Sequence, residues 1–146
     1  MKVRKAKPSD LMHLSQLFDE YRQFYQQVSN IEAATDFIQQ RLKKADSIIF
    51  VADNGAGLLG FTQLYPSYSS VSMQRIWVLN DLYVSSDARQ CGVAQKLMNA
   101  ANIWAKETMS KGLILETDLD NKKAQKLYDK LGYIRQDSTY HYFLST

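Results

Sequence analysis

A run of small and polar residues just before a helical pattern is the first part of this sequence whose residue types suggest chemistry. The apolar run ending in Leu82-Tyr83-Val84 is followed by a polar turn and then by Arg89-Gln90-Cys91-Gly92-Val93-Ala94. The first turn of a helix has N–H groups without internal partners and a positive dipole end, so it binds anions. Gly92 and Ala94 have little or no side chain, so a pyrophosphate can approach the backbone there. The sequence therefore predicts a phosphate-binding loop.

Other residues of this loop have more than one interpretation. Arg89 and Gln90 add side-chain donors, and Lys96 adds positive charge that also suits solvated surface. Cys91 stands at a helix start, where thiol pKa values are lowered, so a nucleophilic role is one hypothesis. We favour the alternative that any residue fits here because the backbone does the binding. Cys91 is the single cysteine, which excludes an internal disulfide and fits a reducing compartment.

The elements that must position the loop follow from periodicity and turn residues. Asn54-Gly55 predicts a hairpin turn, and Pro66 is expected to end a strand. About seven strands are expected, at residues 3–6, 47–52, 58–65, 74–84, 113–117, 133–135 and 139–144, and helices at about 11–28, 34–42, 92–108 and 121–131. This order predicts an α+β fold, or mixed α/β, with a mostly antiparallel mixed sheet and helices on both faces, in a single domain of residues 1–146.

Composition argues against several classes of function. The chain has 146 residues, 45% hydrophobic and 23% charged, and no apolar run long enough to span a bilayer. The N-terminus is charged where a signal peptide is apolar, so we expect a cytoplasmic protein that binds no membrane. The net charge of +3 is scattered, and His13 and His141 lie far apart. We therefore expect neither a nucleic-acid partner nor a metal.

Two linked motifs resemble those of the GNAT superfamily of N-acetyltransferases. Asp81-Leu82-Tyr83-Val84 followed by Arg89-x-x-Gly92-x-Ala94 is similar to motif A of that family. Asn121-x-x-Ala124-x-x-Leu127-Tyr128-x-x-x-Gly132-Tyr133 is similar to its motif B, at the expected separation. The resemblance is strong from about residue 76 onward and looser before it, and the order of elements agrees with that of the family.

The resemblance implies a sheet splayed in a V, with acetyl-CoA in the gap. It implies that the backbone of Leu82, Tyr83 and Val84 binds the pantetheine arm, and that the loop binds the pyrophosphate. The cofactor-binding residues implied in the loop are Arg89, Gln90, Cys91, Gly92, Val93 and Ala94. Those implied in motif B are Asn121, Ala124, Leu127 and Tyr128, with Lys130 either at the nucleotide phosphate or at solvated surface.

The resemblance also implies catalytic roles for an amine that attacks the thioester directly. Tyr128 stands at the motif B tyrosine, which makes it the candidate to protonate the leaving sulfur; otherwise it is a core residue. Some relatives carry a glutamate where this chain has Asn80, which cannot accept a proton. Asp81 is the nearest acid, and it would either bind the substrate ammonium or relay its proton through water. Asn80 and Asp81 alternate across the sheet, so only one faces the acceptor unless a bulge re-aims them.

The first helix carries the candidate acceptor residues. Glu20, Tyr21, Phe24 and Tyr25 suit a cationic amine, with Tyr65, Tyr68 and Tyr140 completing the wall, although Tyr21 and Tyr25 also suit the wet edge of an amphipathic helix. The set is weakly similar to small polyamine and histone acetyltransferases of the superfamily. We expect a primary amine as acceptor, either a small polyamine-like molecule or a lysine side chain in a peptide. The alternative is a non-catalytic acetyl-CoA-binding regulatory module, and a homodimer fits relatives whose last strands pair or exchange.

Overall fold

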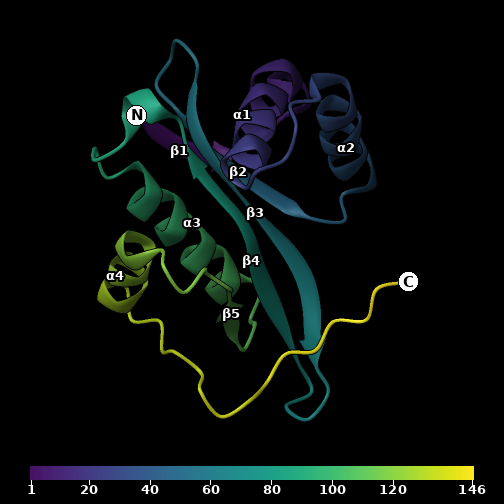
Figure 1. The fold of residues 1–146 in the computed structure, drawn as a ribbon, viewed down its shortest axis with the longest axis vertical. Helices are drawn as coiled ribbons and strands as arrows, with labels where there is room; N and C mark the ends of the chain where they lie inside the picture. Colours follow the sequence, from purple (N-terminus) through teal and green to yellow (C-terminus); the bar gives the residue numbers. More distant parts are fainter. The chain divides into compact units, whose positions relative to one another are not determined.

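A five-stranded sheet in the order β1-β2-β3-β4-β5 runs through residues 1–115 of the computed structural model, which describes residues 1–146 (Figure 1). The chain divides into two compact units, Met1–Leu115 and Glu116–Thr146. The strands are β1 (Lys2–Lys5), β2 (Ile48–Asp53), β3 (Leu58–Ser69), β4 (Gln74–Val84) and β5 (Gly112–Ile114). All of them lie in the first unit.

The sheet is mixed, as the sequence predicts. Strands β1 to β4 pair antiparallel in succession, while β5 pairs parallel to β4. That last pairing joins only Ile76–Val78 of β4 to Gly112–Ile114 of β5. Residues 79–84 of β4 therefore have a strand beside them on the β3 side alone. A free strand edge presents backbone N–H and C=O groups to a ligand.

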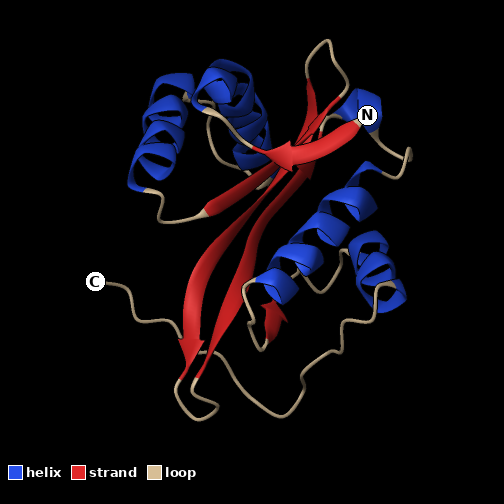
Figure 2. Ribbon diagram, turned by 180° about the vertical axis from the view of Figure 1, so that it is seen from behind, coloured by secondary structure: helices blue, strands red, loops and turns tan.

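Helices cover both faces of the sheet in the first unit, which confirms that expectation (Figure 2). The short η1 (Pro8–Asp10), α1 (Leu11–Phe24) and α2 (Ile31–Lys44) lie on one face, where Phe18 packs against Phe61 of β3 with ring centroids 6.2 Å apart. The short η2 (Ser86–Ala88) precedes α3 (Val93–Glu107), whose Trp104 packs on the other face against Phe50 and Trp77. None of the helices is long and apolar enough to cross a membrane.

The sequence predicts that strand β3 ends at Pro66. In the structure the strand continues to Ser69, so this prediction is wrong. Pairing with β2 stops at Leu64, so beyond that residue β3 pairs with β4 alone. Pro66 lies opposite Trp77 in this outer part of the hairpin. A proline is tolerated in an edge strand because its missing N–H can face away from the partner strand.

The predicted strands at 133–135 and 139–144 are absent, so the sheet has five strands instead of about seven. The second unit contains one helix, α4 (Lys122–Lys130), followed by a segment without regular structure. A strand needs a neighbour to satisfy its backbone groups, and no other segment pairs with these residues. Five large apolar side chains of this segment are 81–94% exposed: Ile134, Tyr140, Tyr142, Phe143 and Leu144.

Candidate functional site

A β-bulge in β4 places Asp81 on the α1 face of the sheet. Gln63 of β3 pairs with Asp81 and the next residue, Leu64, pairs with Leu79, so Asn80 has no partner in β3. Gln63 and Leu64 face opposite sides, and the residues paired with them do the same. In a regular strand, Leu79 and Asp81 would share a face. The bulge that could re-aim the acid is thus present.

The carboxylate of Asp81 is buried, with a relative exposure of 4% for the residue. Its Oδ2 accepts a hydrogen bond of 2.6 Å from Nε2 of Gln63, and its Oδ1 accepts one of 3.0 Å from Nδ2 of Asn80. No arginine, lysine or histidine forms an ion pair with it. A buried carboxylate without a cation is costly, because two neutral amides replace only part of its hydration.

Two tyrosines predicted as acceptor residues lie within the field of this carboxylate. Tyr21 of α1 donates from its hydroxyl to the backbone carbonyl of Asn80 at 3.3 Å. Burial, and then the charge of Asp81, raises the pKa of Tyr21 far above its usual range. The same two causes raise the pKa of Tyr65 to about 12. Both phenols are therefore neutral at physiological pH and offer aromatic faces and hydroxyl donors beside Asp81.

The other predicted acceptor residues are more scattered. The ring of Tyr25 packs edge-on against that of Tyr21, with centroids 5.1 Å apart. Glu20 instead accepts a 3.3 Å hydrogen bond from the hydroxyl of Tyr83. Tyr68 is bound to Arg75, whose Nη2 donates to its hydroxyl at 2.8 Å, and Tyr140 belongs to the second unit. Phe24 is half exposed and packs on Tyr25.

The predicted phosphate loop has the geometry of an open helix N-terminus. Helix α3 begins at Val93, and Gly92 accepts its first helical bond from the N–H of Lys96 at 3.1 Å. Gly92 has a φ of +76°, and a Cβ built there would meet no protein atom within 4 Å. A glycine is needed at this position for its backbone conformation, and the space beside it is open to a ligand. Gln90 and Cys91 are exposed in the same loop.

The side chain of Arg89 contacts strand β4 and does not extend into the open space of the loop. Its Nε donates to the carbonyl of Val84 at 3.1 Å, and its guanidinium lies over the ring of Tyr83, 5.6 Å from the centroid. The side chain therefore links the end of β4 to the loop through a hydrogen bond. The sequence pattern does not predict this contact, which depends on where the loop folds back.

Motif B forms α4 in the second unit. Oδ1 of Asn121 accepts a 3.3 Å bond from the N–H of Ala124, so this asparagine is the N-cap of the helix. Ala124, Leu127 and Tyr128 are half-buried, and the ring of Tyr128 lies 6.1 Å from that of Tyr133. Burial, and then Tyr128, raises the pKa of Tyr133 to about 12.

Gln63 and Ser47 are polar residues near Asp81 that the sequence interpretation missed. Gln63 is fully buried, and its Oε1 accepts a 2.8 Å hydrogen bond from the hydroxyl of Ser47. A glutamine within the buried run of β3 was the available indication, because buried polar side chains need partners. Its partner could not be read from the sequence.

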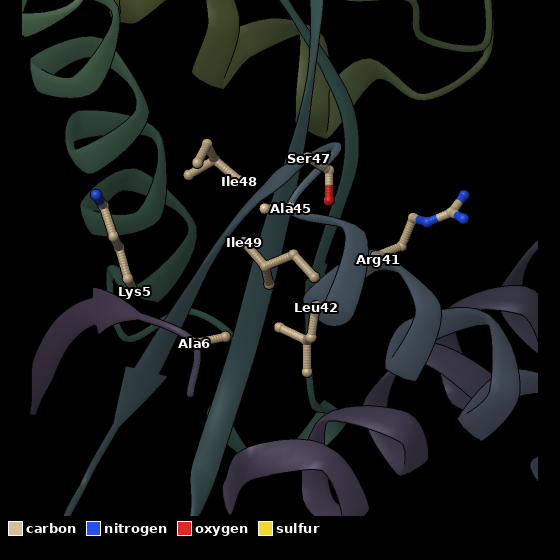
Figure 3. Close-up of a pocket in the computed structure, with 8 residues that line it drawn as sticks. All are labelled: Lys5, Ala6, Arg41, Leu42, Ala45, Ser47, Ile48 and Ile49. Atoms are coloured by element: carbon tan, nitrogen blue, oxygen red, sulfur yellow. The ribbon is translucent and has the colours of Figure 1, made fainter. Parts of the chain in front are cut away.

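Two surface cavities lie apart from Asp81. One of about 130 Å³ has a largely aliphatic lining, and Lys5 and Arg41 point their charged ends away from each other across it (Figure 3). The other, of about 340 Å³, includes His13, Glu20, Asn54, Ser85 and Asp87. Neither is lined by Asp81, Tyr21 or Tyr65. These two cavities are therefore separate from the buried carboxylate and the tyrosines beside it.

The sequence pattern of the acetyltransferase (GNAT) family matches residues 14–133. The chain belongs to this family. It is 42% identical over 145 residues to the uncharacterized N-acetyltransferase YhfO of Bacillus subtilis, covering 99% of this chain and 97% of that protein. It is 30% identical over 135 residues to the D-amino-acid N-acetyltransferase HPA3 of Saccharomyces cerevisiae, covering 90% and 83%. The crystal structure of a probable acetyltransferase superposes with a TM-score of 0.93 at 38% identity, covering 100% and 98%.

Family membership confirms the enzyme class and the acyl donor expected from the sequence. The protein is an N-acetyltransferase that uses acetyl-CoA.

Proposed function

We propose that this acetyltransferase, acting as one domain over residues 1–146, acetylates an aliphatic primary amine whose positive charge is bound by Asp81. The observation that carries the proposal is the buried carboxylate without a cationic partner in its own chain. A substrate ammonium would supply the missing charge, and the aromatic faces of Tyr21 and Tyr65 suit the same cation. Polyamines and lysine side chains are amines of this kind.

The residues of the first unit fit the donor acetyl-CoA, which supplies an activated thioester when bound. The amides of residues 90–94 would hold the diphosphate, since the space beside Gly92 is open. The edge of β4 at Leu82 and Val84 has no strand on one side and would bind the pantetheine arm as an added strand, with the carbonyl of Val84 already accepting from Nε of Arg89. Asn121, Ala124 and Leu127 are assigned to the same arm by their motif; the cap of α4 uses Oδ1 of Asn121 and leaves its Nδ2 donors.

Each proposed proton movement is assigned either to a residue or to solvent. The bound ammonium loses one proton through water to bulk solvent, and Asp81 stabilises the charge until that proton leaves. As the N–C bond forms, the N–H of Leu82 donates to the oxyanion, and as the C–S bond breaks, Oη of Tyr128 gives one proton to the sulfur. The nitrogen loses its second proton through water as the intermediate collapses, and solvent returns one proton to Tyr128, so that each cycle releases one proton in total.

Replacing Tyr128 by phenylalanine tests the proton donor. We expect kcat to fall about 100-fold or more, in the range typical for loss of a general acid, with little change in either KM. Steady-state kinetics with thiol detection measure this. Tyr133→Phe in the same helical unit is the matched control, because it removes a hydroxyl without a hydrogen-bond partner. Equal effects of the two substitutions would remove Tyr128 from the mechanism.

A matched pair of amines tests the acceptor class. We expect 1,4-diaminobutane to exceed 4-aminobutanoate in kcat/KM at least tenfold, because the carboxylate of the second compound is repelled by Asp81. Lysine-bearing peptides and D-alanine complete the panel, measured by thiol release. D-alanine represents a second candidate, the α-amine of an amino acid, which the name of the yeast relative favours. Turnover of D-alanine alone would replace the first candidate by the second.

We also propose that the exposed apolar segment after α4 is buried in a homodimer. Its five large apolar side chains are almost fully exposed in the single chain, and such a concentration favours burial against a partner. Light scattering of the purified protein should give twice the chain mass. A monomer at micromolar concentration would contradict the proposal.

A further inference from the structure

Three side chains form a hydrogen-bonded path across the sheet to Asp81. The hydroxyl of Ser47, just before β2, donates to Oε1 of Gln63 on β3 at 2.8 Å. Nε2 of Gln63 donates to Oδ2 of Asp81 on β4 at 2.6 Å. Gln63 is 0% exposed, so neither end of its amide can be satisfied by bulk water.

The Asp81 carboxylate, which only accepts, determines which end of the Gln63 amide it meets, and the Ser47 hydroxyl binds the other end. A glutamine amide has an accepting oxygen at one side and a donating NH₂ group at the other. With Ser47 donating to the oxygen, the NH₂ group faces the carboxylate. The reversed amide would place its oxygen against Oδ2 of Asp81, where two acceptors repel each other. Ser47 also lines the small pocket of Figure 3, so its hydroxyl lies beside the core and not within it.

We propose that Gln63, held at its other end by Ser47, is a positioning residue for the acceptor amine. It holds the Asp81 carboxylate in one rotamer, so the group is in place before the ammonium arrives. Ordering a charged side chain in advance strengthens binding, because the substrate does not have to organise its own site. The inference rests on the proposed role of Asp81 as the amine-binding carboxylate.

Replacing Gln63 by methionine, which is similar in length and apolar, tests the path. We expect the KM for 1,4-diaminobutane to rise about 10- to 100-fold, in line with the loss of a hydrogen bond to a charged group. The KM for acetyl-CoA should stay within twofold. Ser47→Ala should raise the amine KM about 3- to 10-fold, the size of a neutral hydrogen bond. The double variant should match Gln63→Met alone, because Ser47 acts through Gln63.

Thr62→Val is the matched control. Thr62 is equally buried on the same strand and also donates to Asp81, but to the backbone carbonyl, at 2.8 Å. It should lower the melting temperature without changing the amine KM. If Thr62→Val raises that KM as much as Gln63→Met does, the effect is one of general stability and the proposal is overturned.

Two further readouts separate this inference from the proposed function. If Asp81→Asn raises the amine KM and Gln63→Met does not, the positioning role alone is wrong. If the enzyme does not acetylate 1,4-diaminobutane, hydrogen exchange of the Gln63 side chain tests the inference without any turnover. In ¹⁵N-labelled protein the Gln63 side-chain NH₂ should exchange with solvent at least tenfold more slowly than exposed glutamines, and faster in Ser47→Ala. Exchange as fast as in exposed glutamines would overturn the proposal.

Discussion

Asparagine in place of Asp81 is expected to lower kcat/KM for 1,4-diaminobutane about 100-fold while the protein stays folded and binds CoA normally. Loss of one partner of a buried, hydrogen-bonded charge pair costs about 2–5 kcal/mol. The loss should fall on the amine KM, because the proposed role of Asp81 is to bind the ammonium. Steady-state kinetics with both substrates varied, and calorimetry with CoA, measure the two halves of this prediction.

The free enzyme should not be destabilised by the same substitution. Asparagine has nearly the shape of aspartate, and its Oδ1 can keep the hydrogen bond from Gln63. The donor of Asn80 loses its acceptor, but Asn80 is exposed and can turn to water. Removing a buried charge that has no cation should leave the melting temperature equal or higher. A lower melting temperature together with weaker CoA binding would identify Asp81 as a structural residue.

Asp46→Asn is the matched control for charge. Asp46 pairs with Arg41 at 3.1 Å, and its charge also reaches Tyr65. Losing this half-exposed carboxylate should leave the amine KM within about twofold, since exposed ion pairs contribute little. If Asp46→Asn raises the amine KM as much as Asp81→Asn does, the site attracts cations through the summed field of its carboxylates and not through Asp81 alone.

Alanine in place of Gly92 is expected to weaken CoA binding about 10- to 100-fold, which corresponds to loss of hydrogen bonds to a charged phosphate. The added methyl group meets no protein atom within 4 Å, so it would project into the space that the diphosphate is proposed to occupy. The φ of +76° adds about 1–2 kcal/mol of backbone strain to the folded state. Calorimetry with CoA and thermal unfolding measure the two effects separately.

Gly55→Ala provides the control for that strain. Gly55 has a φ of +89° in the turn between β2 and β3, and the space beside it is also open. Both substitutions should therefore lower the free energy of unfolding by a similar amount, while only Gly92→Ala should weaken CoA binding. Unchanged CoA affinity in Gly92→Ala would show that the start of α3 does not hold the diphosphate.

Much of the fold was predictable because its patterns are local. Strand β4 has the bounds expected from its apolar run, and α3 and α4 end within a residue or two of the expected positions. Hydrophobic periodicity and turn residues act over a few neighbours, so they can be read from a short segment. The two predicted strands after residue 132 failed for the opposite reason: a strand depends on a partner, and the segment has none within its own chain.

The sequence by itself determined the family and the donor and predicted the phosphate loop, because motif A and motif B are contiguous residue patterns that belong to helix starts and strand ends. Only the tertiary structure decided that Asp81 faces α1, that Gln63 and Asn80 bind its two oxygens, and that Tyr21 and Tyr65 lie in its field. These contacts follow from the pairing of β3 with β4 and from the bulge at Asn80. A bulge is a property of two strands together, so neither strand's sequence states it alone.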